Sequence, residues 1–122
     1  MKSLTFSIVI LLFTSCLSGQ TKFKNISKQD LEEALKLSKI QLVDVRTQAE
    51  FDKGFIAGAS LINFWEDDFL SKVTQKFDKN KPIYLYCKVG GRSSKAAKIL
   101  VKEGFKEVYS LEGGYSNWIK TK

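Results

Sequence analysis

The sequence predicts a single α/β domain with a mainly parallel sheet flanked by helices, and three observations carry this prediction. Short β-rich runs alternate along the chain with helical patterns, which is typical of βα units. Polar residues follow two of the β-rich runs, as they do where parallel strands present a ligand site at their carboxyl ends. The 122 residues, 43% hydrophobic and 27% charged, suit one globular domain.

The domain is expected to begin at residue 23 with a short strand over 23–26. Ser27 then has the character of a helix N-cap, because Asp30 follows at the third helical position. Ile26 and Leu31 have the spacing of a hydrophobic staple across the same helix start. The helix continues with apolar or small side chains on one face, at Leu31, Ala34, Leu35 and Ser38.

The middle of the chain predicts two short strands, at 41–45 and 59–63, with a short helix over 48–53 between them. A longer helix is expected over 65–77, since its apolar residues recur at helical spacing. Those residues are Phe69, Leu70, Val73 and Phe77.

The last third repeats the alternation of strand and helix. A strand is expected at 83–87, and a helix begins at Ser93 and stops before Gly104, a natural C-terminal cap. One face of that helix is small and apolar, with Ala96, Ala97, Ile99 and Leu100. A strand at 107–111 and a closing helix at 115–120 complete the domain.

The first sixteen residues predict an export signal that ends at Cys16. Lys2 gives a positive start, and the apolar stretch that follows is about ten residues long, against the ~20 that span a bilayer. Residues 13–16 resemble the bacterial lipobox, in which the cysteine is acylated and becomes the first residue of the mature chain.

From this resemblance we expect an exported lipoprotein at the periplasmic face of a bacterial membrane. Lipid on Cys16 would anchor it, residues 17–22 would form a polar tether, and residues 23–122 the domain. Two alternatives stay open. Cys16 is a bystander in an ordinary cleaved signal, which gives a soluble periplasmic or secreted protein, or the segment is an uncleaved anchor.

Charge and composition exclude several kinds of site. The chain has no histidine, so catalysis by Ser-His-Asp or Cys-His groups, histidine-ligated zinc and a histidine pH switch are excluded. The net charge is +7, but the lysines are scattered, which favours a solvated surface over a nucleic-acid interface. We expect no metal or other cofactor and no nucleic-acid partner.

Cys87 is the candidate nucleophile. It follows a β-rich run and opens a turn, residues 87–92 (the cysteine loop), whose members after the cysteine are Lys88, Val89, Gly90, Gly91 and Arg92. Two glycines permit a nest of N–H groups, the helix beginning at Ser93 points its positive end at the turn, and two cationic side chains lie beside it. Each effect favours the thiolate, the nucleophilic form. A free cysteine elsewhere is more often a small packing residue.

Three stretches of the sequence resemble motifs of the rhodanese family of sulfurtransferases. They are Leu42-Val43-Asp44-Val45-Arg46 with Glu50 and residues 54–59; Tyr86 to Ser93, matching Cys-x-x-Gly-x-Arg-Ser; and Gly104-Phe105, Val108, Leu111, Gly113-Gly114 and Trp118. The chain therefore resembles a single-domain rhodanese from residue 23 onward, and the resemblance implies a doubly wound α/β fold. Phe55 stands where the family usually has histidine, and we interpret it as a packing change.

The resemblance implies how the site would work. Cys87 would take sulfane sulfur from a small anionic donor such as thiosulfate, and Lys88, Val89, Gly90, Gly91, Arg92 and Ser93 would bind the donor and the persulfide. A thiol, cyanide or a protein sulfur acceptor would then remove the outer sulfur. If Cys16 carries lipid, Cys87 is the only free thiol of the mature chain, so the acceptor comes from outside.

The resemblance also leaves choices open. It places Asp44 and Arg46 beside the loop, where a structural ion pair is favoured over direct catalysis. Phosphatase relatives have one more residue between cysteine and arginine, so the four residues here favour sulfur over phosphate. A non-catalytic rhodanese-like sulfur carrier or protein-binding module is the main alternative function. Trp65 is interpreted as core rather than as a pocket wall, and the glycine pair at 113–114 is given no chemistry.

Overall fold

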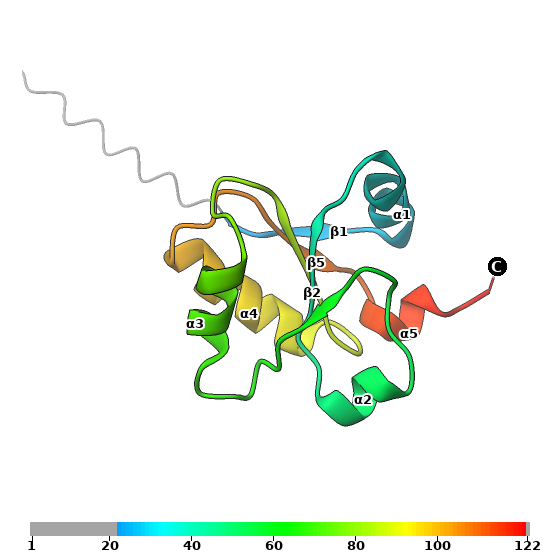
Figure 1. Ribbon diagram of the computed structural model, residues 1–122. Helices are drawn as coiled ribbons and strands as arrows, with labels where there is room; N and C mark the ends of the chain where they lie inside the picture. Colours follow the sequence, from blue (N-terminus) through cyan, green and yellow to red (C-terminus); the bar gives the residue numbers. More distant parts are fainter. Residues whose placement is uncertain (1–21, 122) are drawn as a thin grey trace, which may run out of the picture.

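The computed structural model describes residues 22–121, which are arranged around a five-stranded sheet (Figure 1). The strands are β1 (Lys24–Ile26), β2 (Gln41–Asp44), β3 (Ser60–Leu61), β4 (Ile83–Tyr86) and β5 (Val108–Leu111). Their order across the sheet is β1-β5-β4-β2-β3, and each neighbouring pair is parallel. The predicted parallel sheet is confirmed.

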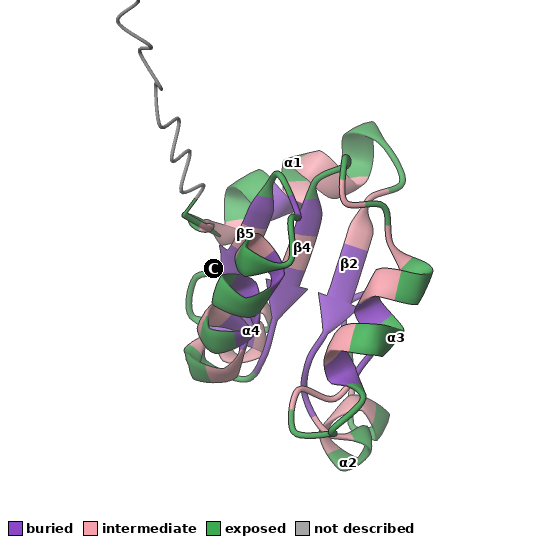
Figure 2. Cartoon of the chain, turned by 90° about the vertical axis from the view of Figure 1, so that its left-hand side faces the viewer, coloured by how far each residue is buried: buried purple, intermediate pink, exposed green. Residues whose placement is uncertain are grey.

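Helices cover both faces of this sheet. They are α1 (Lys28–Leu37), α2 (Gln48–Asp52), α3 (Phe69–Lys76), α4 (Gly91–Lys102) and α5 (Gly114–Trp118). Figure 1 shows α3 and α4 on one side of the strands and α1 and α5 on the other. Figure 2 shows buried residues along the central strands and on the helix faces turned toward them. The fold is therefore doubly wound, as predicted.

The side chains of β4 point alternately into two buried apolar clusters, because successive residues of a strand point to opposite faces of the sheet. Ile83 and Leu85 belong to the buried cluster that includes residues of α3 and α4. Tyr84 and Tyr86 belong to the cluster with Leu31 of α1. The same alternation carries Cys87, directly after β4, into the cluster on the α3 and α4 side.

The first helix begins as the sequence indicates. The Ser27 hydroxyl accepts a hydrogen bond from the backbone N–H of Asp30 at 3.1 Å, which satisfies one of the free donors of the first turn. Ile26 packs against the cluster that contains Leu31, so the predicted staple spacing corresponds to a shared apolar contact region.

Three helices begin at other residues than predicted. α3 begins at Phe69 rather than at residue 65, because the Asn63 side chain accepts the N–H of Trp65 at 3.0 Å and holds a turn there. α4 begins at Gly91, two residues before Ser93, and α5 at Gly114, one residue before 115. Strands β2 and β3 lie within the predicted ranges.

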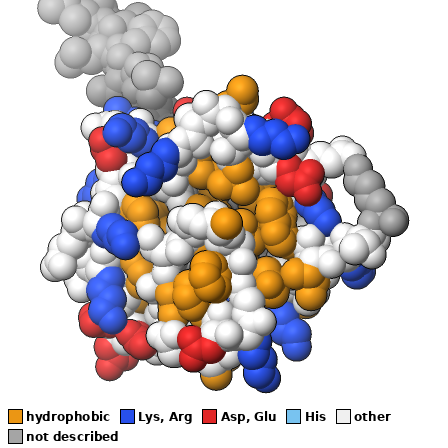
Figure 3. Space-filling model, turned by 45° about the vertical axis from the view of Figure 1, so that its right-hand side comes forward, with side chains coloured by type: hydrophobic (Ala, Val, Ile, Leu, Met, Phe, Trp, Pro, Cys, Tyr) orange, Lys and Arg blue, Asp and Glu red, His pale blue; other side chains and the backbone are white. Residues whose placement is uncertain are grey.

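The predicted signal segment, Cys16 and the tether up to residue 21 lie outside the described residues. Within residues 22–121, no helix combines the length and the apolar character needed to cross a membrane. On the face drawn in Figure 3, Lys and Arg side chains are spread around the periphery with acidic side chains among them, as a solvated lysine-rich surface would show.

Candidate active site

Cys87 lies immediately after β4, at the carboxyl edge of the sheet. Tyr86, the residue before it, pairs in register with Asp44 at the end of β2, so the two predicted polar segments meet at one edge. The Cys87 residue is 1% exposed, and it is a free cysteine. The sulfur is therefore surrounded by protein atoms, and the groups around it determine whether it is protonated.

Hydrogen bonds to the sulfur come from the cysteine loop and from the first turn of α4. The N–H of Gly90 donates to the Cys87 Sγ at 3.0 Å, and the Ser93 Oγ lies 3.4 Å from the same sulfur. Burial alone raises the pKa of the thiol. The Ser93 hydroxyl and the N–H groups of Ser93, Gly90 and Val89 act against burial and prevail, so the pKa of the Cys87 thiol lies below its ordinary value. The arrangement favours a thiolate nucleophile.

One glycine of the pair, rather than both, adopts a backbone angle that other residues resist. Gly90 has a φ of 123°, whereas Gly91 is already the first residue of α4. The helix has no capping side chain at Gly90. The Cys87 sulfur accepts the N–H of Gly90, one of the free donors at the start of α4, and it therefore lies at the positive end of the helix dipole.

The start of α5 supports the cysteine loop from the other side. The N–H groups of Tyr115 and Ser116 donate to the carbonyl oxygens of Cys87 at 2.8 Å and Lys88 at 3.0 Å. Gly114 lies so close that a Cβ atom there would stand 2.5 Å from both oxygens. The sequence analysis assigned this glycine no chemistry, although a glycine pair separated by one residue from the strand end at Leu111 was an available signal.

Glu50 belongs to one of the rhodanese-like motifs, but the sequence analysis assigned it no role in the site. Its two carboxylate oxygens accept hydrogen bonds from Arg92 at 2.7 and 2.9 Å. This bidentate contact with Arg92 is the main reason that the pKa of Glu50 falls to about 2. The Arg92 guanidinium also lies 4.7 Å from the centre of the Trp65 ring. The charge of Arg92 is therefore balanced by a carboxylate, a partner that the sequence analysis did not predict.

Trp65 is not a core residue, contrary to the sequence interpretation. It is 66% exposed and its ring contacts the arginine of the cysteine loop. The turn held by Asn63 moves Trp65 out of α3, and so away from the apolar face of that helix. Phe55 is 49% exposed and stacks on Phe51 with 4.1 Å between ring centroids, a packing arrangement at the surface.

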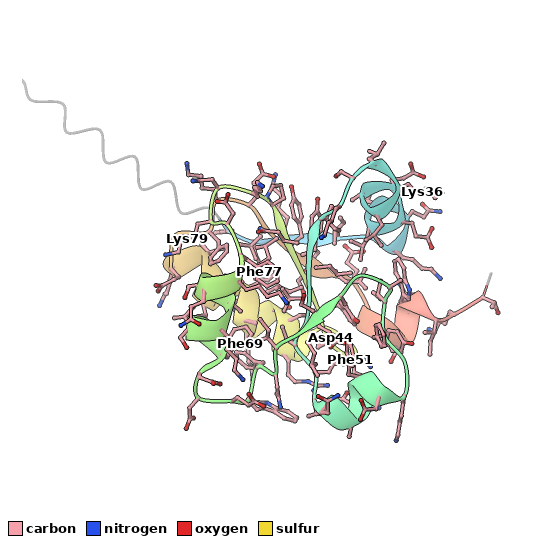
Figure 4. All side chains as sticks on the ribbon, viewed as in Figure 1. Lys36, Asp44, Phe51, Phe69, Phe77 and Lys79 are labelled. Atoms are coloured by element: carbon pink, nitrogen blue, oxygen red, sulfur yellow. The ribbon has the colours of Figure 1, made fainter. Side chains whose placement is uncertain are left out.

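Asp44 and Arg46 form a buried ion pair with 2.7 Å between Arg46 Nη2 and Asp44 Oδ2. Figure 4 labels Asp44, which lies at the end of β2. Burial lowers the pKa of Arg46, but the hydrogen bond and charge of Asp44 prevail and raise it. Arg46 also donates to the carbonyl oxygen of Gly54 at 2.7 Å and lies over the Tyr115 ring. The pair joins β2, the segment after α2, and α5, which suits the structural role favoured from the sequence.

The cysteine loop also has two exposed residues, Lys88 and Val89, of which Val89 is the more apolar. Among residues 22–121, no group of three His, Cys, Asp or Glu side chains is placed to hold a metal ion.

Comparisons with known proteins agree with this geometry. The family model described as "Rhodanese-like domain" matches residues 27–121. The thiosulfate sulfurtransferase GlpE of Coxiella burnetii is 38% identical over 96 residues, covering 79% of this chain and 87% of that protein. The protein of the same name from Shewanella oneidensis is 34% identical over 98 residues, covering 80% and 94%. A crystal structure of a rhodanese-like domain protein from Staphylococcus aureus has a TM-score of 0.70 at 35% identity, covering 79% and 91%.

Proposed function

The chain belongs to the rhodanese-like domain family, and from that premise we propose that it is a sulfurtransferase that moves sulfane sulfur through a persulfide on Cys87. The observation that carries the proposal is the hydrogen-bonded sulfur. The Gly90 N–H and the Ser93 hydroxyl surround the Cys87 Sγ and lower the pKa of its thiol despite burial. Relatives named thiosulfate sulfurtransferase support the same reaction class.

The first step is attack on the donor. The Cys87 thiolate forms a bond to the outer sulfur of thiosulfate, the S–S bond of thiosulfate breaks, and sulfite leaves with the electron pair. The product is a Cys87 persulfide with its charge on the outer sulfur. We expect the N–H groups that stabilise the thiolate to stabilise this anion as well.

The second step discharges the persulfide. A nucleophilic acceptor, cyanide or a thiolate on a small molecule or protein, bonds to the outer sulfur, and the bond between the two sulfurs breaks. Cys87 leaves as the thiolate and the cycle closes without a net oxidant or reductant. Cys87 is the sole cysteine of the described residues, so the acceptor is a separate molecule or group.

The cations at the loop guide the donor rather than perform the chemistry. Lys88 is exposed, and Arg92 is oriented by Glu50 and Trp65. The hydrogen bond with Glu50 is the main reason that the pKa of Arg92 is raised, and the charge of Cys87 adds to it, so the guanidinium interacts electrostatically with the sulfur even while it is paired. We propose that the two cations attract the anionic donor and that the loop amides hold the transferred sulfur.

Thiosulfate:cyanide sulfurtransferase assays on the full chain test the proposal. We expect turnover with the natural sequence and with Cys16→Ser, and none with Cys87→Ser. Thiosulfate alone should add about 32 Da to the Cys87-containing protein, the mass of one persulfide sulfur. Cys16→Ser is the matched control because it removes a thiol of the same chain outside the domain.

The alternative, a rhodanese-like sulfur carrier or protein-binding module, gives a different pattern. A persulfide that forms on Cys87 without turnover to cyanide would favour the carrier. Absence of both turnover and the mass increase, in protein shown to be folded, would overturn the sulfurtransferase proposal and leave the protein-binding module.

We also propose that the protein is exported and anchored by lipid on Cys16, which rests on the amino-terminal sequence alone. Radioactive palmitate supplied to a bacterial host should label the full chain, and Cys16→Ser should abolish the label. Labelling that persists in Cys16→Ser would refute the anchor, and an unlabelled but cleaved chain would indicate an ordinary secretory signal.

A further inference from the structure

A buried serine on β5 extends the hydrogen-bond network behind the Cys87 sulfur. Ser110 is 1% exposed, and its Oγ lies 2.8 Å from the Oγ of Ser93. The Ser93 Oγ lies 3.4 Å from the Cys87 Sγ and 3.2 Å from the carbonyl oxygen of Gly90. Two buried hydroxyl groups therefore form a hydrogen-bonded chain that leads to the sulfur, and the second of them has no part in the rhodanese-like motifs described above.

The number of available protons sets the direction of these bonds. Each serine hydroxyl carries one proton and can accept through its lone pairs, and a buried hydroxyl proton without an acceptor is costly. Within the described residues, the hydrogen-bond partner of the Ser110 side chain is the Ser93 Oγ. Ser110 satisfies its proton by donating to Ser93, which leaves the Ser93 proton for the Gly90 carbonyl oxygen or for the sulfur.

We infer that Ser110 is a positioning residue for Cys87, because its hydroxyl donates to Ser93 and so directs the Ser93 proton toward the reacting sulfur. In the thiol form, the Cys87 S–H donates to the Ser93 Oγ, and Ser93 donates to the Gly90 carbonyl oxygen. When the sulfur is ionised, the Ser93 proton turns to the sulfur, since a charge-assisted hydrogen bond is the stronger one.

Loss of the Ser110 hydroxyl affects the two forms unequally. The thiol form still has one donor to the Ser93 oxygen, namely the Cys87 S–H. In the thiolate form the sulfur has no proton to donate, and the Ser93 proton is itself donated to the sulfur. The Ser93 oxygen would therefore be buried without any hydrogen-bond donor. The variant therefore penalises the thiolate selectively, and the chain of two hydroxyls no longer strengthens the bond to sulfur.

Other groups around the sulfur do not change in this comparison. The charged side chains that bear on it are Arg92 of α4, whose pKa Cys87 influences, and the exposed Lys88 of the loop. β2 supplies the apolar Val43 to the same core cluster, and α5 supplies the N–H of Tyr115 to the Cys87 carbonyl oxygen. A substitution at Ser110 leaves all of these in place, so its effect isolates the hydroxyl network.

The test measures the titration of Cys87 by alkylation. The full chain carrying Cys16→Ser, which leaves Cys87 as its one thiol, is reacted with iodoacetamide across pH 5–10 with and without Ser110→Ala. At pH 7 we expect Ser110→Ala to slow alkylation by about 3- to 10-fold, as partial loss of a charge-assisted hydrogen bond would, with rates converging at high pH. Tyr109→Phe is the matched control, since it removes a neighbouring β5 hydroxyl that binds Glu107, and it should leave the pH profile unchanged.

These outcomes distinguish the positioning role of Ser110 from the proposed sulfurtransferase function on which the inference rests. An unshifted profile in folded Ser110→Ala would overturn the inference, and so would an equal shift in Tyr109→Phe. Alkylation does not require sulfur transfer, so a shifted profile in a protein without sulfurtransferase activity would retain the role of Ser110 and reject the catalytic proposal. In an active protein, Ser110→Ala should lower sulfur transfer at pH 7 in proportion to the thiolate lost.

Discussion

Replacing Glu50 by glutamine removes the carboxylate that orients Arg92 and changes little else. Glutamine keeps the length of the side chain and one oxygen acceptor. That oxygen can still receive the N–H of Thr47, which Glu50 Oε1 accepts at 3.2 Å in the capping box of α2. The variant therefore tests the ion pair between Glu50 and Arg92 rather than the helix.

The structure sets both the size and the sign of the effect. The pKa of Glu50 is lowered from 4.5 to about 2, chiefly by the hydrogen bond from Arg92. By linkage this corresponds to at most about 3 kcal/mol of folding stability. Because the two side chains stay 16% and 27% exposed, we expect about 1–2 kcal/mol after solvent screening. A lowered pKa means that this stability is present above pH 4.5 and is lost as the pH falls toward 2.

Urea denaturation of Glu50→Gln, Arg92→Gln and the double variant gives the coupling free energy between the two side chains. We expect about 1–2 kcal/mol at pH 7, with about half or more lost at pH 3. The exposed pair of Glu66 and Lys72 is the matched control. Its side chains are 51% and 47% exposed, so the same cycle there should give less than about 0.5 kcal/mol.

Two results would refute this reasoning. A coupling at pH 7 no larger than that of the exposed control pair would mean that the bidentate contact contributes nothing measurable. A coupling that keeps its full size at pH 3 would mean that it does not arise from the charge of Glu50.

Two further substitutions probe the supports of the site. Gly114→Ala places a Cβ 2.5 Å from backbone oxygens of the cysteine loop at a φ of 58°, so we expect a loss of about 2–4 kcal/mol in thermal or urea unfolding. Sulfur transfer should fall at least ~10-fold, since a small misplacement of reacting groups is costly. Gly58→Ala, with a φ of 89° and open space, is its control and should cost about 1 kcal/mol with activity retained. Asp44→Asn leaves the buried Arg46 charge without its partner and should cost about 3–5 kcal/mol in unfolding experiments, whereas a loss below ~1 kcal/mol would contradict a buried structural pair.

Much of the fold was predictable because its signals are local. Ser27 and Asp30 are three residues apart, and the helix cap they form depends on that spacing alone. The strands were predictable for the same reason. Successive residues of a strand point to opposite faces, and both faces of a parallel sheet bury apolar side chains, so each strand is visible in the sequence as a short β-rich run. The predicted first residues of the helices were less accurate. The Asn63 turn delays the start of α3, and α4 begins at Gly91, directly after the Gly90 N–H that the Cys87 sulfur accepts.

The local sequence was enough to predict the candidate nucleophile and the groups that bond to it, because Cys87, Gly90 and Ser93 lie within one strand-turn-helix segment whose geometry brings their atoms together. The distant groups that complete the site depend on the tertiary structure. Glu50 reaches Arg92 across 42 positions of the chain, and Ser110 reaches Ser93 across 17. Those contacts depend on how the strands are ordered, with β4 between β2 and β5, and long-range order of this kind follows from packing the whole core rather than from any local pattern.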